Sequence, residues 1–177
     1  MKSTELGIGV IGAGRIGTLR ARLAAKHPAV RFLAVSDKEA GNAKALAELA
    51  GADFHSADND AVIAHPDVNA VFVSTPEGEH ASAVCRALEL GKPVLVEKPI
   101  ALSLNDAEAI LKTLKSTGGV LRVGYSRRFK ECFLRAKEQM RHGRLGKVSG
   151  ALARVYNSRA QTFAILKRDP HATPVLD

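Results

Sequence analysis

Residues 6–17 read LGIGVIGAGRIG, an apolar run that leads into the glycines Gly12, Gly14 and Gly17. The apolar run predicts a buried strand, and the residues after it predict a helix over about 15–26. Between a strand and a helix, this glycine spacing allows a tight turn, a close approach of the backbone to a pyrophosphate, and close packing of the helix on the strand. The free N–H groups at the start of that helix are suitable donors to phosphate. The stretch therefore predicts the phosphate-binding turn of a dinucleotide-binding fold.

Short apolar segments alternate with Ala- and Leu-rich amphipathic segments through the first two thirds of the chain. The expected strands cover about 6–11, 31–35, 53–55, 70–74, 93–96 and 120–124. The expected helices cover about 15–26, 39–50, 58–64, 77–90 and 105–117, the last of them capped by Ser103 or Asn105. The strands are nearly continuous hydrophobic runs, as is typical of strands covered on both faces. We therefore expect an α/β fold, a Rossmann-type doubly wound parallel sheet with helices on both faces.

The composition is that of a globular protein. Of the 177 residues, 46% are hydrophobic, and no apolar window approaches the ~20 residues that a membrane-spanning helix needs. The N-terminus lacks a long apolar segment with a cleavage site, so we expect a cytoplasmic protein without a membrane partner. Cys85 and Cys132 are far apart in the sequence and are expected to be free thiols. The six histidines lack zinc-ligand spacing, so no metal is expected.

The net charge of +8 arises after residue 120, where 13 Lys and Arg residues stand against 4 Asp and Glu residues. A basic segment of this kind can meet nucleic acid or acidic ligands. Its basic residues fall on a helix expected over about 130–142, without interleaved aromatic residues or a known binding motif. A solvated helix face is the simpler interpretation, and nucleic-acid binding is kept as the lesser alternative.

Asp37 lies 20 residues past Gly17, at the end of the second expected strand. An acidic side chain at this place can accept both ribose hydroxyls of a dinucleotide and repels a 2′-phosphate, which favours NAD over NADP. Lys38 leaves NADP open, because a neighbouring cation can accommodate that phosphate. The alternative is that the glycines serve packing only and that Asp37 caps the next helix.

Polar residues follow the strand expected at 70–74. In an open α/β sheet, ligands lie beyond the carboxyl ends of the strands, so these residues fall on the cofactor side. Ser74 and Thr75 either cap the following helix or contact the cofactor, and Pro76 comes directly after them. His80 lies about one turn into the helix, where a packing role and a cofactor-side role are both open.

The strand expected at 93–96 ends in Glu97, Lys98 and Pro99. Successive strand residues point to opposite faces, so adjacency alone does not pair Lys98 with Glu97. An ammonium group at the carboxyl end of a strand can donate hydrogen bonds to a substrate hydroxyl or carbonyl. Pro99 restricts Lys98 to extended geometry and makes a cis peptide bond feasible. The alternative is a surface lysine beside a turn proline.

Together these residues resemble the glucose-fructose oxidoreductase / inositol dehydrogenase (Gfo/Idh/MocA) family. The resemblance rests on the glycine pattern, Asp37, STPEGEH after the fourth strand, EKP after the fifth and GYSRRF after the sixth, and it extends from residue 6 to about 150. EKP in this place is more specific than the glycine pattern. The resemblance implies an NAD(P)-dependent oxidoreductase that acts on a CH–OH group of a sugar, polyol or inositol-like compound, with NAD as the cofactor and NADP as the alternative.

The resemblance also implies roles for particular residues. Lys98 is expected to contact both the nicotinamide and the reacting substrate, the Lys98–Pro99 bond can be cis, and Arg127 is expected to point toward the active site. The expected catalytic residues are Lys98 and Asp177. The expected cofactor-binding residues are Gly12, Gly14, Arg15, Ile16, Asp37, Ser74, Thr75, Pro76, His80, Glu97, Lys98 and Arg127.

The chain departs from the family pattern in two places. Ser126 stands where the family usually has asparagine or another larger residue. Family members continue into a second α/β domain that covers the substrate and forms oligomers, and here only its first strand, about 147–157, and a following stretch are expected. We therefore expect a Rossmann NAD(P)-binding domain over 1–125 and the start of a truncated substrate and oligomerisation domain over 126–177.

In similar proteins an Asp and a His about four positions later complete the acid/base set with the lysine. Asp177 in TPVLD matches the Asp, and the His has no position in this sequence. Hydride transfer needs a substrate held close to the nicotinamide, so the chain alone is expected to be a weak or inactive enzyme. A homo-oligomer is expected of a full-length form. A non-catalytic NAD(P)-binding sensor or interaction module remains the alternative.

Overall fold

The structure is a computed structural model that describes residues 5–152, 154, 163 and 167. Internal contacts divide the chain into two compact units, Met1–Gly124 and Tyr125–Asp177, which are described separately below. Within the described residues, no helix is both long and apolar enough to cross a membrane. A cytoplasmic location stays a prediction.

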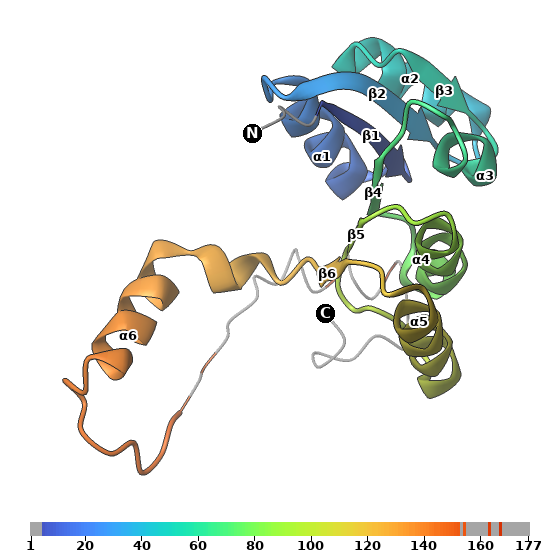
Figure 1. Ribbon diagram of the computed structural model, residues 1–177. Helices are drawn as coiled ribbons and strands as arrows, with labels where there is room; N and C mark the ends of the chain where they lie inside the picture. The colour runs from blue at the N-terminus through green and yellow to red at the C-terminus, as the bar shows by residue number, and fades with distance from the viewer. Residues whose placement is uncertain (1–4, 153, 155–162, 164–166, 168–177) are drawn as a thin grey trace. The chain divides into compact units, whose positions relative to one another are not determined.

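The first unit contains a six-stranded sheet in which every neighbouring pair of strands is parallel (Figure 1). Its strands are β1 (Leu6–Ile11), β2 (Val30–Ser36), β3 (Phe54–Ser56), β4 (Ala70–Val73), β5 (Val94–Val96) and β6 (Leu121–Val123). They lie in the order β3-β2-β1-β4-β5-β6, the doubly wound order of dinucleotide-binding folds, in which the direction of winding reverses between β1 and β4. The predicted fold class is confirmed, and each expected strand of this unit is present.

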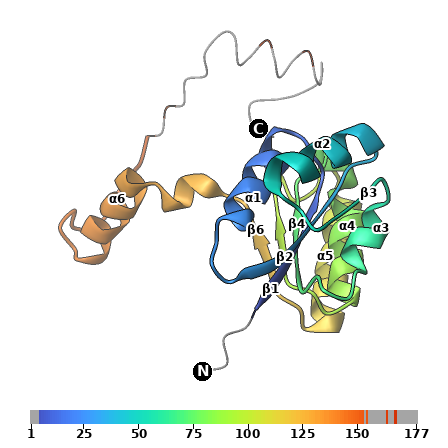
Figure 2. The ribbon, with the colours of Figure 1, turned by 90° about the horizontal axis from the view of Figure 1, so that it is seen from above.

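Helices connect the strands and cover both faces of the sheet. They are α1 (Arg15–Ala25), α2 (Ala40–Ala50), α3 (Asn59–Ile63), the 3-10 turn η1 (Glu77–Glu79), α4 (His80–Glu89) and α5 (Leu104–Thr117). Seen from above, α1 and α2 lie on one side of the sheet and α3, α4 and α5 on the other (Figure 2). Ser103 is the residue that caps α5, since its Oγ accepts a hydrogen bond from the Asp106 N–H at 3.1 Å.

The alternation of side chains along β1 creates a separate core on each face of the sheet. Val10 belongs to a buried cluster that includes Ala21 of α1 and Leu46 of α2. Its neighbour Ile11 belongs to a second cluster, which includes Val84 of α4. Burial of each such aliphatic side chain contributes about 1.5–3 kcal/mol. Because both faces are packed, the loops at the strand ends are held by a rigid scaffold.

The second unit contains the 3-10 turn η2 (Ser126–Phe129) and the helix α6 (Glu131–Arg141), and no residue of these two elements is buried. The strand expected over 147–157 is not found in its described residues, 147–152 and 154, and the rest of it lies outside the described residues. A strand is stable only when its backbone groups pair with a neighbouring strand, and the described part of this unit supplies no such neighbour. Asp177 also lies outside the described residues.

Candidate functional site

The carboxyl ends of four parallel strands lie together at one edge of the sheet. Backbone hydrogen bonds continue the ladder one residue past the strands, because the Ser74 N–H donates to the Ile11 carbonyl at 2.8 Å and the Glu97 N–H donates to the Val73 carbonyl at 3.0 Å. Ligands of open α/β sheets bind outside this edge, where the winding reverses. We use the term strand-end site for the predicted residues that follow these strands: Gly12, Gly14, Arg15, Ile16, Asp37, Ser74, Thr75, Glu97 and Lys98.

The three glycines of the first loop have different structural roles. Gly12 has φ +97°, and a Cβ there would lie 2.7 Å from the Ser74 carbonyl oxygen. A Cβ on Gly17 would collide with the Gly12 carbonyl. A Cβ on Gly14, in contrast, would meet no heavy atom within 4 Å. Gly12 and Gly17 are therefore required by the fold itself, whereas Gly14 leaves the open space that a close approach of a phosphate group needs.

Asp37 connects this glycine loop with the start of α2. Its Oδ2 accepts a hydrogen bond from the Ala13 N–H at 2.8 Å. Its Oδ1 accepts one from the N–H of Glu39, the residue that precedes α2, at 3.0 Å. The Asp37 Oδ1 also accepts a hydrogen bond from the Asn42 Nδ2 at 3.4 Å. The N-cap of α2 is Glu39, and no side chain caps this helix, so the alternative interpretation of Asp37 as a helix cap is wrong. An ionised carboxylate has about four acceptor positions, so these three contacts leave capacity for a ribose hydroxyl.

Lys38, the next residue, forms an ion pair with Glu79 of η1. The Lys38 Nζ lies 3.4 Å from the Glu79 Oε1, and the two side chains are 69% and 42% exposed. The pair connects the loop after β2 with the turn after β4. Sequence reasoning did not single out Glu79, because only the sheet order brings residues 41 positions apart to the same edge.

Glu97 of the EKP stretch is held by Arg20 of α1. The Arg20 Nε donates to the Glu97 Oε1 at 3.1 Å, and the Nη2 group of the same guanidinium donates to the same oxygen. A Cβ on Gly124 would lie 3.1 Å from the Glu97 carboxyl group, so the backbone of the loop after β6 packs against it. This environment gives Glu97 a structural partner in the helix that follows the glycine loop. A direct contact of Glu97 with the cofactor stays a prediction.

His80, the first residue of α4, is 1% exposed and connects two loops of the site. Its Nδ1 lies 2.8 Å from the Pro99 carbonyl oxygen and its Nε2 lies 3.1 Å from the Thr75 carbonyl oxygen. Both ring nitrogens therefore face protein carbonyl groups, which favours a packing and positioning role. The Lys98–Pro99 peptide bond is cis, as the family resemblance implied.

Two hydroxyl groups at the end of β4 are buried without hydrogen-bond partners within the described residues, the Ser74 Oγ and the Thr75 Oγ1. Neither acts as the helix cap that was one of the two interpretations of these residues. A buried hydroxyl without a partner costs about 1–3 kcal/mol. Together with the space beside Gly14 and the acceptor capacity of Asp37, these hydroxyls fit a site that gains polar contacts from a bound dinucleotide.

The remaining predicted site residues are less enclosed. Arg15 is exposed and Ile16 is half-buried in the first turn of α1, and Pro76 is exposed at the start of η1. Arg127 is exposed in η2 of the second unit. Among the described residues, no cluster of three His, Cys, Asp or Glu side chains could hold a metal ion. Cys85 and Cys132 are both free thiols.

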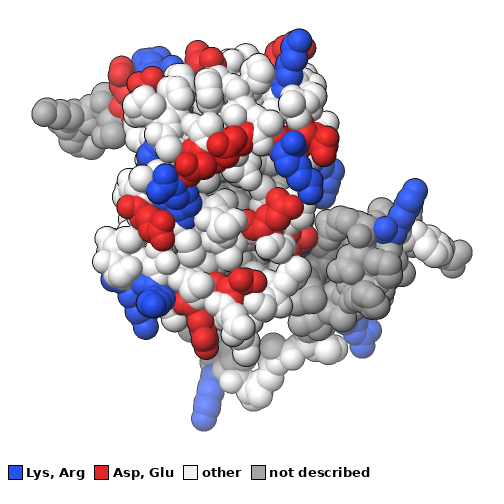
Figure 3. Space-filling view, turned by 90° about the vertical axis from the view of Figure 1, so that its right-hand side faces the viewer, with Lys and Arg blue, Asp and Glu red and all other residues white. Residues whose placement is uncertain are grey.

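Acidic and basic side chains are mixed on the face of the molecule shown in Figure 3. Nucleic-acid binding, for which an extended basic patch is typical, gains no support from that face. On α6, Arg135 forms an ion pair with Glu131 one turn earlier, as expected of a solvated helix. Nucleic-acid binding by the second unit stays a prediction.

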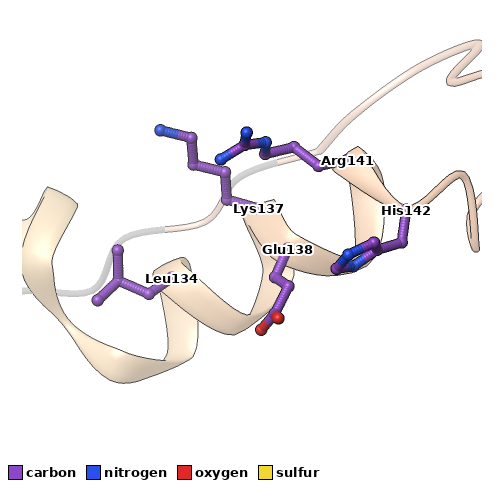
Figure 4. A pocket seen from close by; sticks show the side chains of 5 residues that line it. All are labelled: Leu134, Lys137, Glu138, Arg141 and His142. Atoms are coloured by element: carbon purple, nitrogen blue, oxygen red, sulfur yellow. The ribbon is translucent and has the colours of Figure 1, made fainter.

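Two open cavities lie along helices and contain none of the predicted site residues. One, of about 530 Å³, lies on α6, where Lys137 and Arg141 extend to the same side of the helix (Figure 4). Its described lining residues are Leu134, Lys137, Glu138, Arg141 and His142. The other, of about 500 Å³, lies on α5. Each is lined by described residues of one helix only, so the strand-end site is the stronger candidate for function.

Comparisons with known proteins match the first unit to a family model and most of the chain to longer relatives. A family model described as an oxidoreductase family with an NAD-binding Rossmann fold matches residues 6–125. An inositol 2-dehydrogenase of Rhizobium meliloti (strain 1021) is 34% identical over 167 residues, which make up 94% of this chain and 46% of the relative. A scyllo-inositol 2-dehydrogenase (NAD(+)) of Bacillus subtilis (strain 168) is 34% identical over 139 residues, 78% of this chain and 41% of the relative.

Solved structures of longer inositol dehydrogenases also superpose on most of this chain. The scyllo-inositol dehydrogenase from Lactobacillus casei, with bound NAD(H) and scyllo-inositol, superposes with a TM-score of 0.76 at 27% identity, over 81% of this chain and 43% of that protein. The ligand-free form of the same enzyme superposes with a TM-score of 0.78 over 84% of this chain and 45% of that protein. The chain therefore spans less than half the length of these relatives.

Proposed function

Because the chain belongs to the oxidoreductase family with an NAD-binding Rossmann fold, we propose that the strand-end site binds NAD and that the whole protein transfers hydride between nicotinamide and a polyol hydroxyl. The observation that carries the proposal is that the glycine loop, Asp37 and Lys98 follow the carboxyl ends of β1, β2 and β5, on both sides of the point where the sheet reverses its winding. Two of the matched relatives are inositol dehydrogenases by name, which favours an inositol or a similar polyol as the substrate.

The residues that would hold the dinucleotide divide according to its parts. The pyrophosphate would lie beside Gly14, where the first N–H groups of α1 have no side-chain cap. The ribose hydroxyls would donate to Asp37, and the unpartnered Ser74 and Thr75 hydroxyls lie on the same edge. When bound, NAD supplies the acceptor for the hydride.

The chemistry assigned to this chain centres on Lys98. Oxidation of a secondary hydroxyl breaks its C–H and O–H bonds, so a protein group must hold the oxygen and receive the hydroxyl proton. We assign the first task to Lys98. The second belongs to the acid/base set that Lys98 would form in the whole protein with the acidic partner expected at Asp177 and with a His that has no position in this sequence. The Arg20–Glu97 pair and the His80–Pro99 contact would fix the loop that carries Lys98.

The second unit would supply the beginning of a substrate and oligomerisation domain. This assignment rests on the family resemblance and on the greater length of the relatives. The Arg127 side chain in η2 would then face the active site. NADP as an alternative coenzyme and a homo-oligomeric full-length form are parts of the same proposal.

The test supplies the chain with the second domain of a matched relative and follows the reduction of NAD with a panel of inositols and sugars. We expect turnover of at least one inositol. Lys98→Ala is expected to abolish turnover while NADH binding, followed by nicotinamide fluorescence, is retained. An extended protein that binds NADH but oxidises nothing in the panel would instead support a non-catalytic NAD-binding module.

A further inference from the structure

We propose that Glu79 is a determinant of coenzyme choice, which disfavours NADP by holding Lys38 in an ion pair. The inference rests on the proposed function, because it concerns the ribose end of the same dinucleotide site. The sequence pointed to Asp37 and Lys38 as the residues that decide between NAD and NADP. Glu79, in the turn after β4, is a further one.

The Asp37 carboxylate follows the end of β2, where the adenosine ribose of a dinucleotide lies in this fold. Lys38 is the next residue, and its Nζ lies 3.4 Å from the Glu79 Oε1. Glu79 is the last residue of η1, which follows β4 on the other side of β1 in the sheet. The pair therefore lies beside the expected position of the ribose.

NAD and NADP differ at the adenosine ribose. NADP carries a phosphate on the 2′-oxygen of this ribose, and its binding requires a cation that can pair with the phosphate. Lys38 follows Asp37 directly and is the cation that sequence reasoning identified for this task. In the structure its charge is already compensated by Glu79. Glu79 also adds a second carboxylate beside the one that repels the phosphate.

The ion pair between Lys38 and Glu79 is weak because it is exposed. The two side chains are 69% and 42% exposed, and an exposed ion pair changes an equilibrium constant by a factor of about 1.4 to 5. A lysine side chain is flexible enough to exchange one anionic partner for another. Loss of the Glu79 charge therefore strengthens NADPH binding by a modest factor, because Lys38 becomes available to the phosphate and one repulsive carboxylate is removed.

The experiment compares NADH and NADPH titrations of the full 177-residue chain, followed by nicotinamide fluorescence at low salt. In Glu79→Gln, the dissociation constant of NADPH is expected to fall by about two- to fivefold, while that of NADH changes by less than about 1.5-fold. In the double variant Lys38→Met/Glu79→Gln the gain for NADPH is expected to disappear. Added salt is expected to reduce the gain, since it screens exposed charges.

Glu48→Gln provides a matched control. Glu48 lies in α2 and forms a similarly exposed ion pair with Lys44, one turn earlier on the same helix. This substitution also removes one negative charge, but from outside the strand-end site, so the ratio of the two dissociation constants should stay at the wild-type value. If this ratio changed equally in Glu48→Gln and Glu79→Gln, the cause would be the net charge of the chain, and the inference would be wrong.

The outcomes separate the inference from the proposed function. If the wild-type chain binds NADH but Glu79→Gln leaves the NADPH to NADH ratio unchanged, the inference is wrong and NAD binding stands. The same holds if the gain persists in the double variant, because Lys38 then has no part in it. If the wild-type chain binds neither coenzyme, the proposed function fails, and the inference fails with it.

Discussion

Arg20 in the helix after the glycine loop and Glu97 in the EKP stretch form an ion pair across 77 positions of the sequence. The two side chains are only 25% and 16% exposed. The pair links the segment expected to bind the pyrophosphate with the segment that carries Lys98. The segments expected to bind the cofactor and to carry Lys98 are thus joined by a contact that is neither part of the sheet nor part of the hydrophobic core.

Substitution of Arg20 by Met should destabilise the first unit. The variant leaves the Glu97 carboxylate largely buried and without its ionic partner, which costs about 1–3 kcal/mol. Urea unfolding followed by circular dichroism measures this loss. Arg22→Met is the matched control, because Arg22 is an exposed arginine of the same helix. Equal midpoints for the two variants would show that the pair has no structural role.

Substitution of His80 by Ala should have a larger effect than substitution of an exposed histidine. The ring of His80 is buried and faces two carbonyl oxygens, so its loss leaves a cavity and removes the hydrogen bond that the ring N–H can donate to one of them. We expect a loss of about 2–4 kcal/mol in the free energy of unfolding. His55→Ala, at an exposed position of β3, is the control and should stay close to the wild type. A small effect at His80 would contradict the bridging role.

The Asp60–Arg86 pair between α3 and α4 predicts a pH dependence. The hydrogen bond from Arg86 holds the pKa of Asp60 below its ordinary value of 3.8. Asp60 therefore stays ionised to lower pH in the folded state than in the unfolded state. Its contribution to stability is complete above 3.8 and is lost as the pH falls through the lower folded value.

Unfolding of Asp60→Asn at several pH values measures this contribution. Both side chains are well exposed, so the deficit of the variant at neutral pH should be small and should shrink further with salt. The deficit should vanish in acid, below the folded pKa of Asp60. A deficit that is equally large in acid would assign the effect to packing rather than to charge. The double variant Asp60→Asn/Arg86→Met should lack this part of the pH dependence.

The structure separates the glycine that the fold requires from the one that leaves space for a ligand. Gly12→Ala places a side chain at φ +97° against the Ser74 carbonyl and should lower stability by about 1–3 kcal/mol. Gly14→Ala meets open space and has φ −68°, so its unfolding midpoint should match the wild type. A strong loss of stability in Gly14→Ala would contradict this division.

Local sequence patterns were sufficient to predict the sheet and its main loop. The apolar runs predicted the strands of the first unit, and the glycine spacing identified the turn at Gly12 because Gly12 and Gly17 each meet a steric requirement. The EKP stretch made a cis bond before Pro99 feasible, and this bond is cis, whereas the role of Lys98 stays a prediction. These features depend on neighbours in the chain, which a sequence pattern records directly.

The ion pairs that complete the candidate site could not be predicted in this way. Arg20 and Glu97, like Lys38 and Glu79, meet only because the sheet order places distant strand ends at one edge. The sequence predicted His80 one turn into a helix. In the structure the 3-10 turn η1 comes first, and His80 is the first residue of α4. The side-chain contacts of a position depend on such tertiary details, whereas its place at a strand end does not.

The most direct test of the central claim is a fluorescence titration of the 177-residue chain with NADH, with Gly14→Val measured beside it. We expect saturable binding of one NADH per chain, weakened at least tenfold in Gly14→Val, because the added side chain occupies the space assigned to the pyrophosphate. If the unfolding midpoint of Gly14→Val equals that of the wild type, the weaker NADH binding is not caused by a loss of stability. Absence of NADH binding by the wild-type chain, or equal binding by a folded Gly14→Val variant, would contradict the assignment of the strand-end site.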